Sequence, residues 1–111
     1  MYDQLTGLSN RRKFMEFGQE EIKRAQRTKN KLWLLILDID YFKKINDTEG
    51  HDMGDQLLVT LSQMLENSVC SIDLVSCIGG EEFSIILLDT NRQGAARVAE
   101  SIRMKIETSP A

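Results

Sequence analysis

Six large apolar residues in a row, at positions 32–37, constrain the fold of this chain more than any other segment. The run LWLLIL shows no alternation of polar and apolar residues, which is the pattern of a strand with both faces covered. We therefore expect a β-strand here that is buried on both faces. The run is far too short to cross a bilayer, which takes about 20 apolar residues.

Two further β-like runs, residues 74–78 and 83–88, flank the sequence Gly79-Gly80-Glu81-Glu82. Glycine reaches the positive φ angles that a tight turn requires, at little steric cost. Two short strands separated by such a sequence predict a β-hairpin, with both glutamates at its tip.

Three segments have the apolar spacing of amphipathic helices. The first runs from Arg11 to about Thr28, the second follows a loop at residues 50–54, and the third starts at a Thr-x-x-Gln capping box at residues 90–93. The apolar residues that show this spacing are Phe14, Phe17, Ile22 and Ala25 in the first helix, where it is loose, and Leu57, Leu58, Leu61, Met64 and Leu65, which form one stripe, in the second. In the third helix we expect Ala95, Ala99, Ile102 and Ile106 to face inward.

The predicted order of elements gives the fold class. Helix, strand, helix or helices, hairpin and helix contain a β-α-β-β-α sequence, which resembles the ferredoxin-like plan of an α+β domain. That plan normally ends with one more strand beside the first, and this chain stops at Ala111 without one. We expect a single partial domain over residues 1–111, whose first strand has an uncovered edge that tends to associate.

Composition narrows the classes of function. The chain has 111 residues and a net charge of −3, so nothing suggests a non-specific nucleic-acid binder. Neither a membrane-spanning nor a secretory segment is predicted. The two cysteines, Cys70 and Cys77, form neither a disulfide framework nor a metal-binding spacing, and we expect both to be reduced in a cytoplasmic protein.

Acidic residues lie at the end of the first strand. Asp38 and Asp40 follow the apolar run, and Mg²⁺ prefers a few carboxylate oxygens completed by water and phosphate. Asp38, a backbone carbonyl next to it and a glutamate from the hairpin would make such a site. Taken alone, Asp-x-Asp is a weak signal, and Asp40 as the N-cap of a short helix at residues 41–45 is the more common explanation.

The hairpin glutamates have two interpretations. Glu81 and Glu82 place two like charges close together, and a cation would relieve their repulsion. Glu81 could then be both a metal ligand and the base that deprotonates an attacking hydroxyl. The alternative is an acidic turn exposed to solvent.

Residues between the acidic segments suit a nucleotide. Free N–H groups at a helix start, with Lys43 or Lys44, could hold phosphate oxygens. Asn46 and Asp55 are the amide and carboxylate that could read a guanine, although each is also ordinary in a turn or in the first turn of a helix. His51, the only histidine, lies beside Gly50, where packing or capping is commoner than catalysis.

Together these segments resemble the GGDEF family of diguanylate cyclases, in order and through almost the whole chain. The resemblance is carried by residues 3–12 (DQLTGLSNRR), 37–47 (LDIDYFKKIND), 50–55 (GHDMGD) and 79–83 (GGEEF). It implies a fold related to nucleotide cyclases and polymerase palms. It also implies condensation of two GTP molecules into cyclic di-GMP by a homodimer in which each protomer brings one GTP. In the family, a sensory domain usually precedes the cyclase domain.

The family likeness assigns roles to individual residues. It places Mg²⁺ or Mn²⁺ on Asp38, Glu81, Glu82 and the carbonyl of Ile39, with Glu81 also activating the 3′-hydroxyl. It assigns phosphate contacts to Phe42 and Lys43, with Lys43 counted as catalytic, and substrate contacts to Asn46, His51 and Asp55. The chemistry implied is in-line phosphoryl transfer, in which positioning and charge neutralisation do most of the work.

The chain departs from the family pattern in three places. Cys77 stands where the family usually has an Arg, two residues before the Gly-Gly pair. The inhibitory product site, usually Arg-x-x-Asp, is degenerate, because Asp73 is kept while Cys70 replaces the Arg. The part of the family that supplies a last strand, a last helix and a Lys and Arg for the triphosphate is not in these 111 residues.

These departures leave two other hypotheses beside the enzyme. The chain could be a degenerate module that binds GTP or a protein partner without turnover, or a plain α+β interaction domain whose acidic turn is only solvated. Formation of cyclic di-GMP from GTP would distinguish the enzyme from both of these alternatives.

Overall fold

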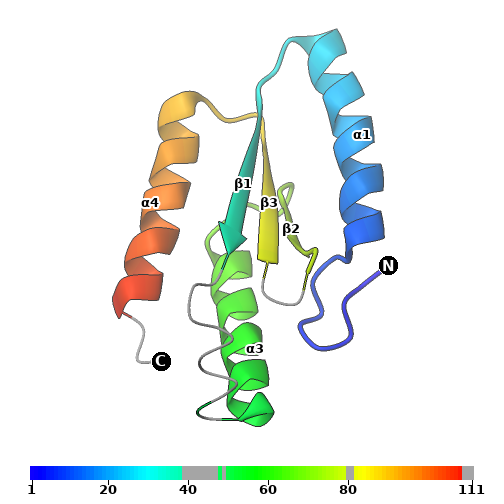
Figure 1. Cartoon of the computed structure of the whole chain (residues 1–111). Helices are drawn as coiled ribbons and strands as arrows, with labels where there is room; N and C mark the ends of the chain where they lie inside the picture. The colour runs from blue at the N-terminus through cyan, green and yellow to red at the C-terminus, as the bar shows by residue number, and fades with distance from the viewer. Residues whose placement is uncertain (39–47, 49, 80–81, 109–111) are drawn as a thin grey trace.

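The computed structural model describes residues 1–38, 48, 50–79 and 82–108, and for His51, Glu107 and Thr108 it describes only the backbone. Within these residues, three helices surround a three-stranded antiparallel sheet with the strand order β1-β3-β2 (Figure 1). In chain order the elements are α1 (Arg11–Thr28), β1 (Leu32–Asp38), α3 (His51–Asn67), β2 (Leu74–Cys77), β3 (Glu82–Leu88) and α4 (Arg92–Thr108). The predicted α+β class and the β2–β3 hairpin are both confirmed.

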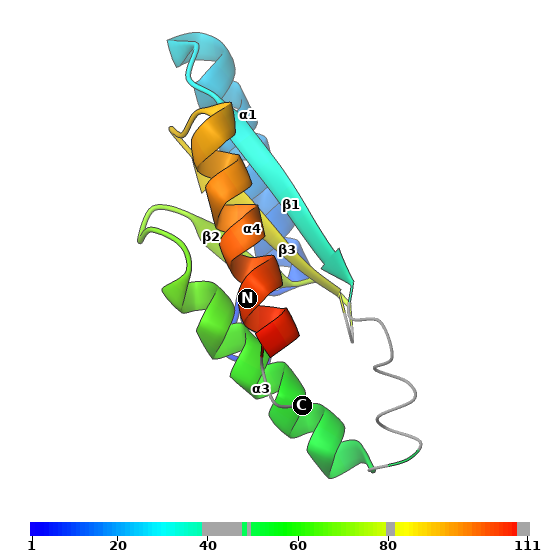
Figure 2. The same cartoon turned by 90° about the vertical axis from the view of Figure 1, so that its left-hand side faces the viewer.

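Helix α1 lies on one face of the sheet, and α3 and α4 lie on the other (Figure 2). Side chains alternate along a strand, so every second residue of β1 faces the same way. Trp33, Leu35 and Leu37 pack with the core on the α3 and α4 side, whereas Leu32 and Leu34 line a small apolar hollow against α1.

The core is centred on β3, the middle strand. Phe83, Ile85 and Leu87 are each at most 1% exposed and meet Leu58 and Leu65 of α3. Full burial of such a side chain contributes about 1.5–3 kcal/mol, so this strand is the most strongly held part of the sheet. The stripe predicted for the second helix is confirmed, with Leu57 and Met64 half-buried at its margins.

The prediction that the first strand is buried on both faces is wrong. Leu34 and Ile36 are 49% and 59% exposed, because β1 lies at the edge of the described sheet and α1 covers only part of that face. The uncovered edge itself was expected. On the other face, a groove of about 570 Å³ separates β1 from α4.

The apolar residues that mark the first and last helices in the sequence are only partly buried. Ala95 and Ile102 are in the core, but Ala99 and Ile106 are exposed and line the groove beside β1. Ile22 of α1 is likewise 49% exposed, and no residue of α1 is fully buried. The helical spacing was correct, but the described sheet is too narrow to cover these side chains.

Two helix starts differ from the predictions. The expected loop at residues 50–54 is the first turn of α3, in which Gly50 is the N-cap and its carbonyl accepts from the Gly54 N–H at 3.3 Å. Gly50 has φ +89°, a conformation that glycine adopts easily, so the glycine starts the helix instead of delaying it. In α4, Asn91 rather than Thr90 provides the cap, because its Oδ1 accepts from the Gly94 N–H at 2.7 Å.

Candidate active site

The sheet brings the two acidic segments of the sequence together. In the antiparallel ladder between β1 and β3, Asp38 is the register partner of Glu82. Directly opposed residues on such strands project to the same face with their Cβ atoms about 4.5–5.5 Å apart. Two carboxylates from distant parts of the chain therefore lie next to each other at one end of the sheet.

The turn between β2 and β3 carries Glu82 to this position, and we call residues 77–82 the signature hairpin. Its base is closed by two backbone hydrogen bonds, in which the N–H groups of Ile78 and Gly79 donate to the Glu82 carbonyl at 3.0 and 3.4 Å. Asp38 is exposed at the last position of β1, and Glu82 is half-buried at the first position of β3. Both side chains therefore lie at strand ends, and the β1–β3 ladder and the hairpin hydrogen bonds fix the backbone there.

The Asp38–Glu82 pair suits a divalent cation. Among the described residues neither carboxylate takes part in a salt bridge, so their mutual repulsion is not offset by a protein cation there. Carboxylate oxygens are the hard ligands that Mg²⁺ and Mn²⁺ prefer. No cluster of three or more His, Cys, Asp or Glu residues suited to a metal occurs within the described part of the chain, so a third ligand of these types would have to come from outside it. Glu81 and Ile39, the other two predicted ligands, lie outside the described residues.

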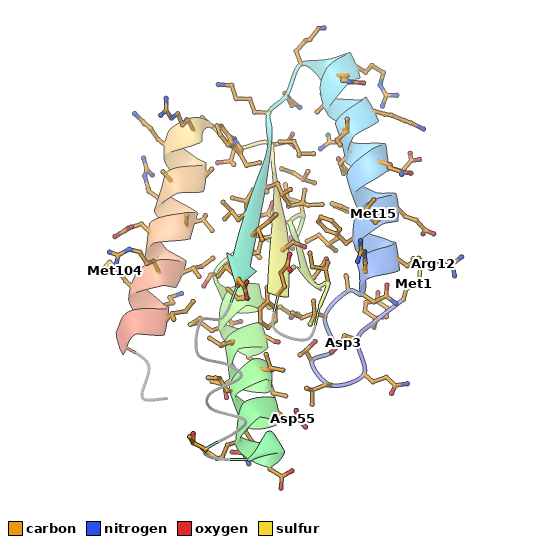
Figure 3. All side chains as sticks on the ribbon, in the orientation of Figure 1. Met1, Asp3, Arg12, Met15, Asp55 and Met104 are labelled. Carbon is orange, nitrogen blue, oxygen red and sulfur yellow. The ribbon has the colours of Figure 1, made fainter. Side chains whose placement is uncertain are left out.

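The predicted nucleotide contacts are only partly described. Phe42, Lys43 and Asn46 lie outside the described residues, and the side chain of His51 is not described. Asp55 is exposed in α3, whose N-terminal half extends past the end of the sheet that carries the acidic pair (Figures 1 and 3). The sequence suggested the first turn of a helix for Asp55, but α3 already begins at His51, so Asp52 is the acidic residue of its first turn and Asp55 follows in the second.

Asp73 has a clear structural role. One carboxylate oxygen accepts from the Cys70 N–H at 3.0 Å, and the other accepts from the Leu88 N–H at 2.9 Å. These bonds close the turn before β2 and tie it to the end of β3. The Cys70 side chain is exposed, and its thiol lacks the planar guanidinium fork with which an arginine binds phosphate or guanine.

Cys77 ends β2 beside the signature hairpin. Its thiol is half-buried and donates to the Gly79 carbonyl at 3.1 Å. Burial, and secondarily the negative charge of Asp3, raise the pKa of Cys77, so the neutral thiol is favoured. Cys70 and Cys77 are both free, as the sequence suggested.

The loop that precedes α1 also belongs to this region, which the sequence did not predict, although residues 3–12 carry part of the family resemblance. Ser9 forms a parallel bridge with Ser76, and the Cys77 N–H donates to the Ser9 carbonyl at 2.9 Å. The chain start therefore lies directly beside the signature hairpin. The Asp-x-x-Thr pattern at residues 3–6 signals a local turn, but nothing in the sequence indicates which strand that turn contacts.

The antiparallel sheet with helices on both faces makes this an α+β domain, and its superposition on solved cyclase domains assigns it to the nucleotide-cyclase-like fold class. Within that class, the chain belongs to the GGDEF family, because the family model described as "Diguanylate cyclase, GGDEF domain" matches residues 1–111. The family makes cyclic di-GMP, and binding of GTP and a metal ion is typical of its members.

Curated relatives and solved structures support this assignment. The chain is 47% identical over 108 residues to the response regulator PleD of Caulobacter vibrioides, covering 97% of this chain and 24% of PleD. It is 44% identical over 105 residues to the diguanylate cyclase DosC of Escherichia coli, covering 95% of this chain and 23% of DosC. The chain thus spans about a quarter of the length of these curated relatives.

Among solved structures, the diguanylate cyclase SiaD of Pseudomonas aeruginosa, in complex with its activator SiaC, superposes with a TM-score of 0.91 at 43% identity. That match covers 96% of this chain and 41% of SiaD. In the part of the chain that the structure describes, we find no helix with the length and apolar character needed to span a membrane.

Proposed function

We propose that this chain carries the nucleotide and metal site of a diguanylate cyclase, which condenses two GTP molecules into cyclic di-GMP and releases diphosphate. The observation that supports this best is the pairing of Asp38 with Glu82 across the β1–β3 ladder. It puts a strand-end carboxylate beside the signature hairpin, and carboxylates close together suit a metal ion that binds a triphosphate.

In this proposal each residue has a defined task. Asp38, Glu81, Glu82 and the Ile39 carbonyl hold Mg²⁺ or Mn²⁺, which when bound neutralises charge that develops on the phosphates. Glu81 accepts the proton of the attacking 3′-hydroxyl.

The remaining residues bind and orient the nucleotide. Phe42 and Lys43 position the phosphates, while Asn46 and Asp55 read the guanine and His51 lines the substrate site. Because the chemistry depends mostly on positioning, a residue that only orients GTP also contributes to the rate.

The reaction requires two copies of the site. Each protomer of a homodimer brings one GTP, and the 3′-hydroxyl of each nucleotide attacks the α-phosphate of the other. We further propose that in the whole protein a sensory domain precedes this one and controls the encounter of the two protomers, and that the reaction takes place in the cytoplasm, where the two free thiols stay reduced.

Incubation of the chain with GTP and Mg²⁺, followed by mass spectrometry, tests the proposal. We expect cyclic di-GMP from the parent and none from Asp38→Asn, with the exposed α1 variant Glu16→Gln as the active control. A folded parent that forms no product would contradict turnover by this chain.

The second candidate is a module that binds GTP or a protein partner without turnover. It is favoured by Cys77, a half-buried neutral thiol at a position where the family usually has an arginine. Calorimetry with a non-hydrolysable GTP analogue separates the two candidates, because binding without product formation supports the module and product formation supports the enzyme.

A further inference from the structure

The loop formed by residues 3–9, which we call the opening loop, is closed by hydrogen bonds that converge on Asp3. The Asp3 N–H donates to the Leu8 carbonyl at 2.7 Å, and the Asp3 carbonyl accepts from the Gly7 N–H at 2.9 Å. The Asp3 carboxylate accepts from both the N–H and the hydroxyl of Thr6, at 2.9 and 2.8 Å. Asp3 thus uses its backbone and its side chain to hold one loop conformation.

The opening loop is also anchored to the body of the domain. Leu8 is 2% exposed and belongs to the main core, and Ser9 is 5% exposed. The chain before the loop is tied back as well, because the Asn10 N–H donates to the Met1 carbonyl at 2.9 Å. Figure 3 shows Asp3 in this loop on the β2 side of the sheet. The loop is therefore a fixed platform and not a loose terminus.

This platform contacts the strand that leads into the signature hairpin. Ser9 pairs with Ser76 on the edge of β2 that faces away from β3, and the Ser9 carbonyl accepts from the Cys77 N–H at 2.9 Å. The chain continues from Cys77 to Ile78 and Gly79, whose N–H groups bond to Glu82. A short bonded path therefore runs from Asp3 through Ser9 and the hairpin base to Glu82, the partner of Asp38.

We infer that Asp3 is a positioning residue for the signature hairpin, because it shapes the opening loop that fixes the β2 end of that hairpin. The proximity of Asp3 to Cys77, which contributes to the raised pKa of that thiol, agrees with this placement. The consequence for catalysis rests on the proposed function, because it concerns the acidic residues that the hairpin carries. The positioning itself does not, and it can be measured without nucleotide.

Site-resolved hydrogen exchange of the amides of Cys77, Ile78 and Gly79 tests the inference. In Asp3→Ala the Thr6 donors lose their acceptor, and we expect these amides to exchange about tenfold faster, since one net hydrogen bond corresponds to roughly a two- to tenfold change in an opening equilibrium. Amides in the middle of β3 should change much less. Asp3→Asn keeps an acceptor oxygen and should restore most of the protection.

A matched control is available at the other end of β2. Asp73 is also a carboxylate that accepts two hydrogen bonds in a turn, from Cys70 and Leu88, but it lies away from the signature hairpin. Asp73→Ala should destabilise the fold without a selective effect on the three hairpin amides. If Asp3→Ala fails to fold, Thr6→Val provides a milder disruption of the same loop and should accelerate the same amides less.

The result that would overturn the inference is equally clear. Either unchanged exchange of the hairpin amides in a folded Asp3 or Thr6 variant, or a uniform acceleration of all amides as in Asp73→Ala, would show that the opening loop does not position the hairpin. If the parent chain forms no cyclic di-GMP, that result contradicts the proposed function but leaves the hydrogen-exchange comparison unaffected.

Discussion

Asp38 and Glu82 face each other across the β1–β3 ladder, although α3 and β2 both lie between them along the chain. Two like charges in directly opposed positions destabilise a sheet by about 0.2–1 kcal/mol unless a cation lies between them. This local cost at the end of an otherwise apolar strand is a feature expected of a binding site, where local stability is given up for function.

The first prediction concerns metal binding at this pair. Without metal, Asp38→Asn should raise the melting temperature by about 1–4 °C, because it removes half of a repulsive pair. Mg²⁺ should raise the melting temperature of the parent and have little effect on the variant, since a ligand stabilises only the state that binds it.

Glu16→Gln, on the exposed face of α1, is the control and should respond to Mg²⁺ as the parent does. Equal Mg²⁺ shifts in the parent and Asp38→Asn would argue against a metal at this pair. Differential scanning fluorimetry gives all of these values.

The second prediction concerns the two thiols. At pH 8 an alkylating reagent should modify Cys70 before Cys77, because Cys70 is exposed whereas burial and Asp3 raise the pKa of Cys77. A raised folded-state pKa stabilises the fold below the ordinary value of 9.0, and this contribution is lost as the pH rises through the folded-state value. Cys77→Ser should therefore flatten the decline in stability above about pH 9. Peptide mass mapping over time checks the order of modification, and faster reaction of Cys77 would contradict it.

The third prediction concerns the product. Calorimetry should detect no tight binding of cyclic di-GMP at the turn of residues 70–73, because the Asp73 carboxylate already accepts two backbone bonds and Cys70 provides no guanidinium. Cys70→Arg should bind cyclic di-GMP more tightly than the parent. Cys70→Lys should improve binding less, because an ammonium cannot form the bidentate hydrogen bonds of a guanidinium. Tight binding by the parent that is lost in Asp73→Ala would show the prediction to be wrong.

The fourth prediction compares two helix glycines. Gly18→Ala in α1 should stabilise the fold by up to about 1 kcal/mol, because the new Cβ meets only Ile86 at an ordinary 3.6 Å and alanine favours helices. Gly94→Ala in α4 should not stabilise the fold, since its Cβ would clash with the Thr90 hydroxyl oxygen. Thr90→Ala should relieve that clash and recover the gain in the double variant. Urea unfolding of the four proteins provides the comparison, and a gain from Gly94→Ala alone would contradict it.

The fifth prediction concerns association through the free edge of β1. Leu34 and Ile36 are exposed along a strand that is paired on one side only within the described sheet, and such an edge tends to recruit another strand. We expect the chain to self-associate at high concentration, and Ile36→Lys to reduce this, because a charged residue on an edge discourages pairing. Ile72→Lys, at a similarly exposed residue away from β1, is the matched control. Light scattering that shows a strict monomer for the parent would rule out the prediction.

The sequence by itself determined the local elements and the family. Apolar spacing located the helices, glycines located the hairpin, and the four motifs identified the GGDEF family, because all of these signals lie in short stretches of chain. The exact helix starts were not determined by the sequence, since a glycine such as Gly50 can end a loop or begin a helix, and only backbone hydrogen bonds decide between them.

Only the tertiary structure decided which of these parts meet. Register across β1 and β3 set Asp38 against Glu82, and the parallel bridge from Ser9 to Ser76 placed the opening loop beside the signature hairpin. Tertiary packing also determined that four apolar residues stay exposed, namely Leu34, Ile36, Ala99 and Ile106. The physical reason is that hydrophobic spacing reports which side of an element is apolar, whereas burial depends on what the rest of the chain brings to that side.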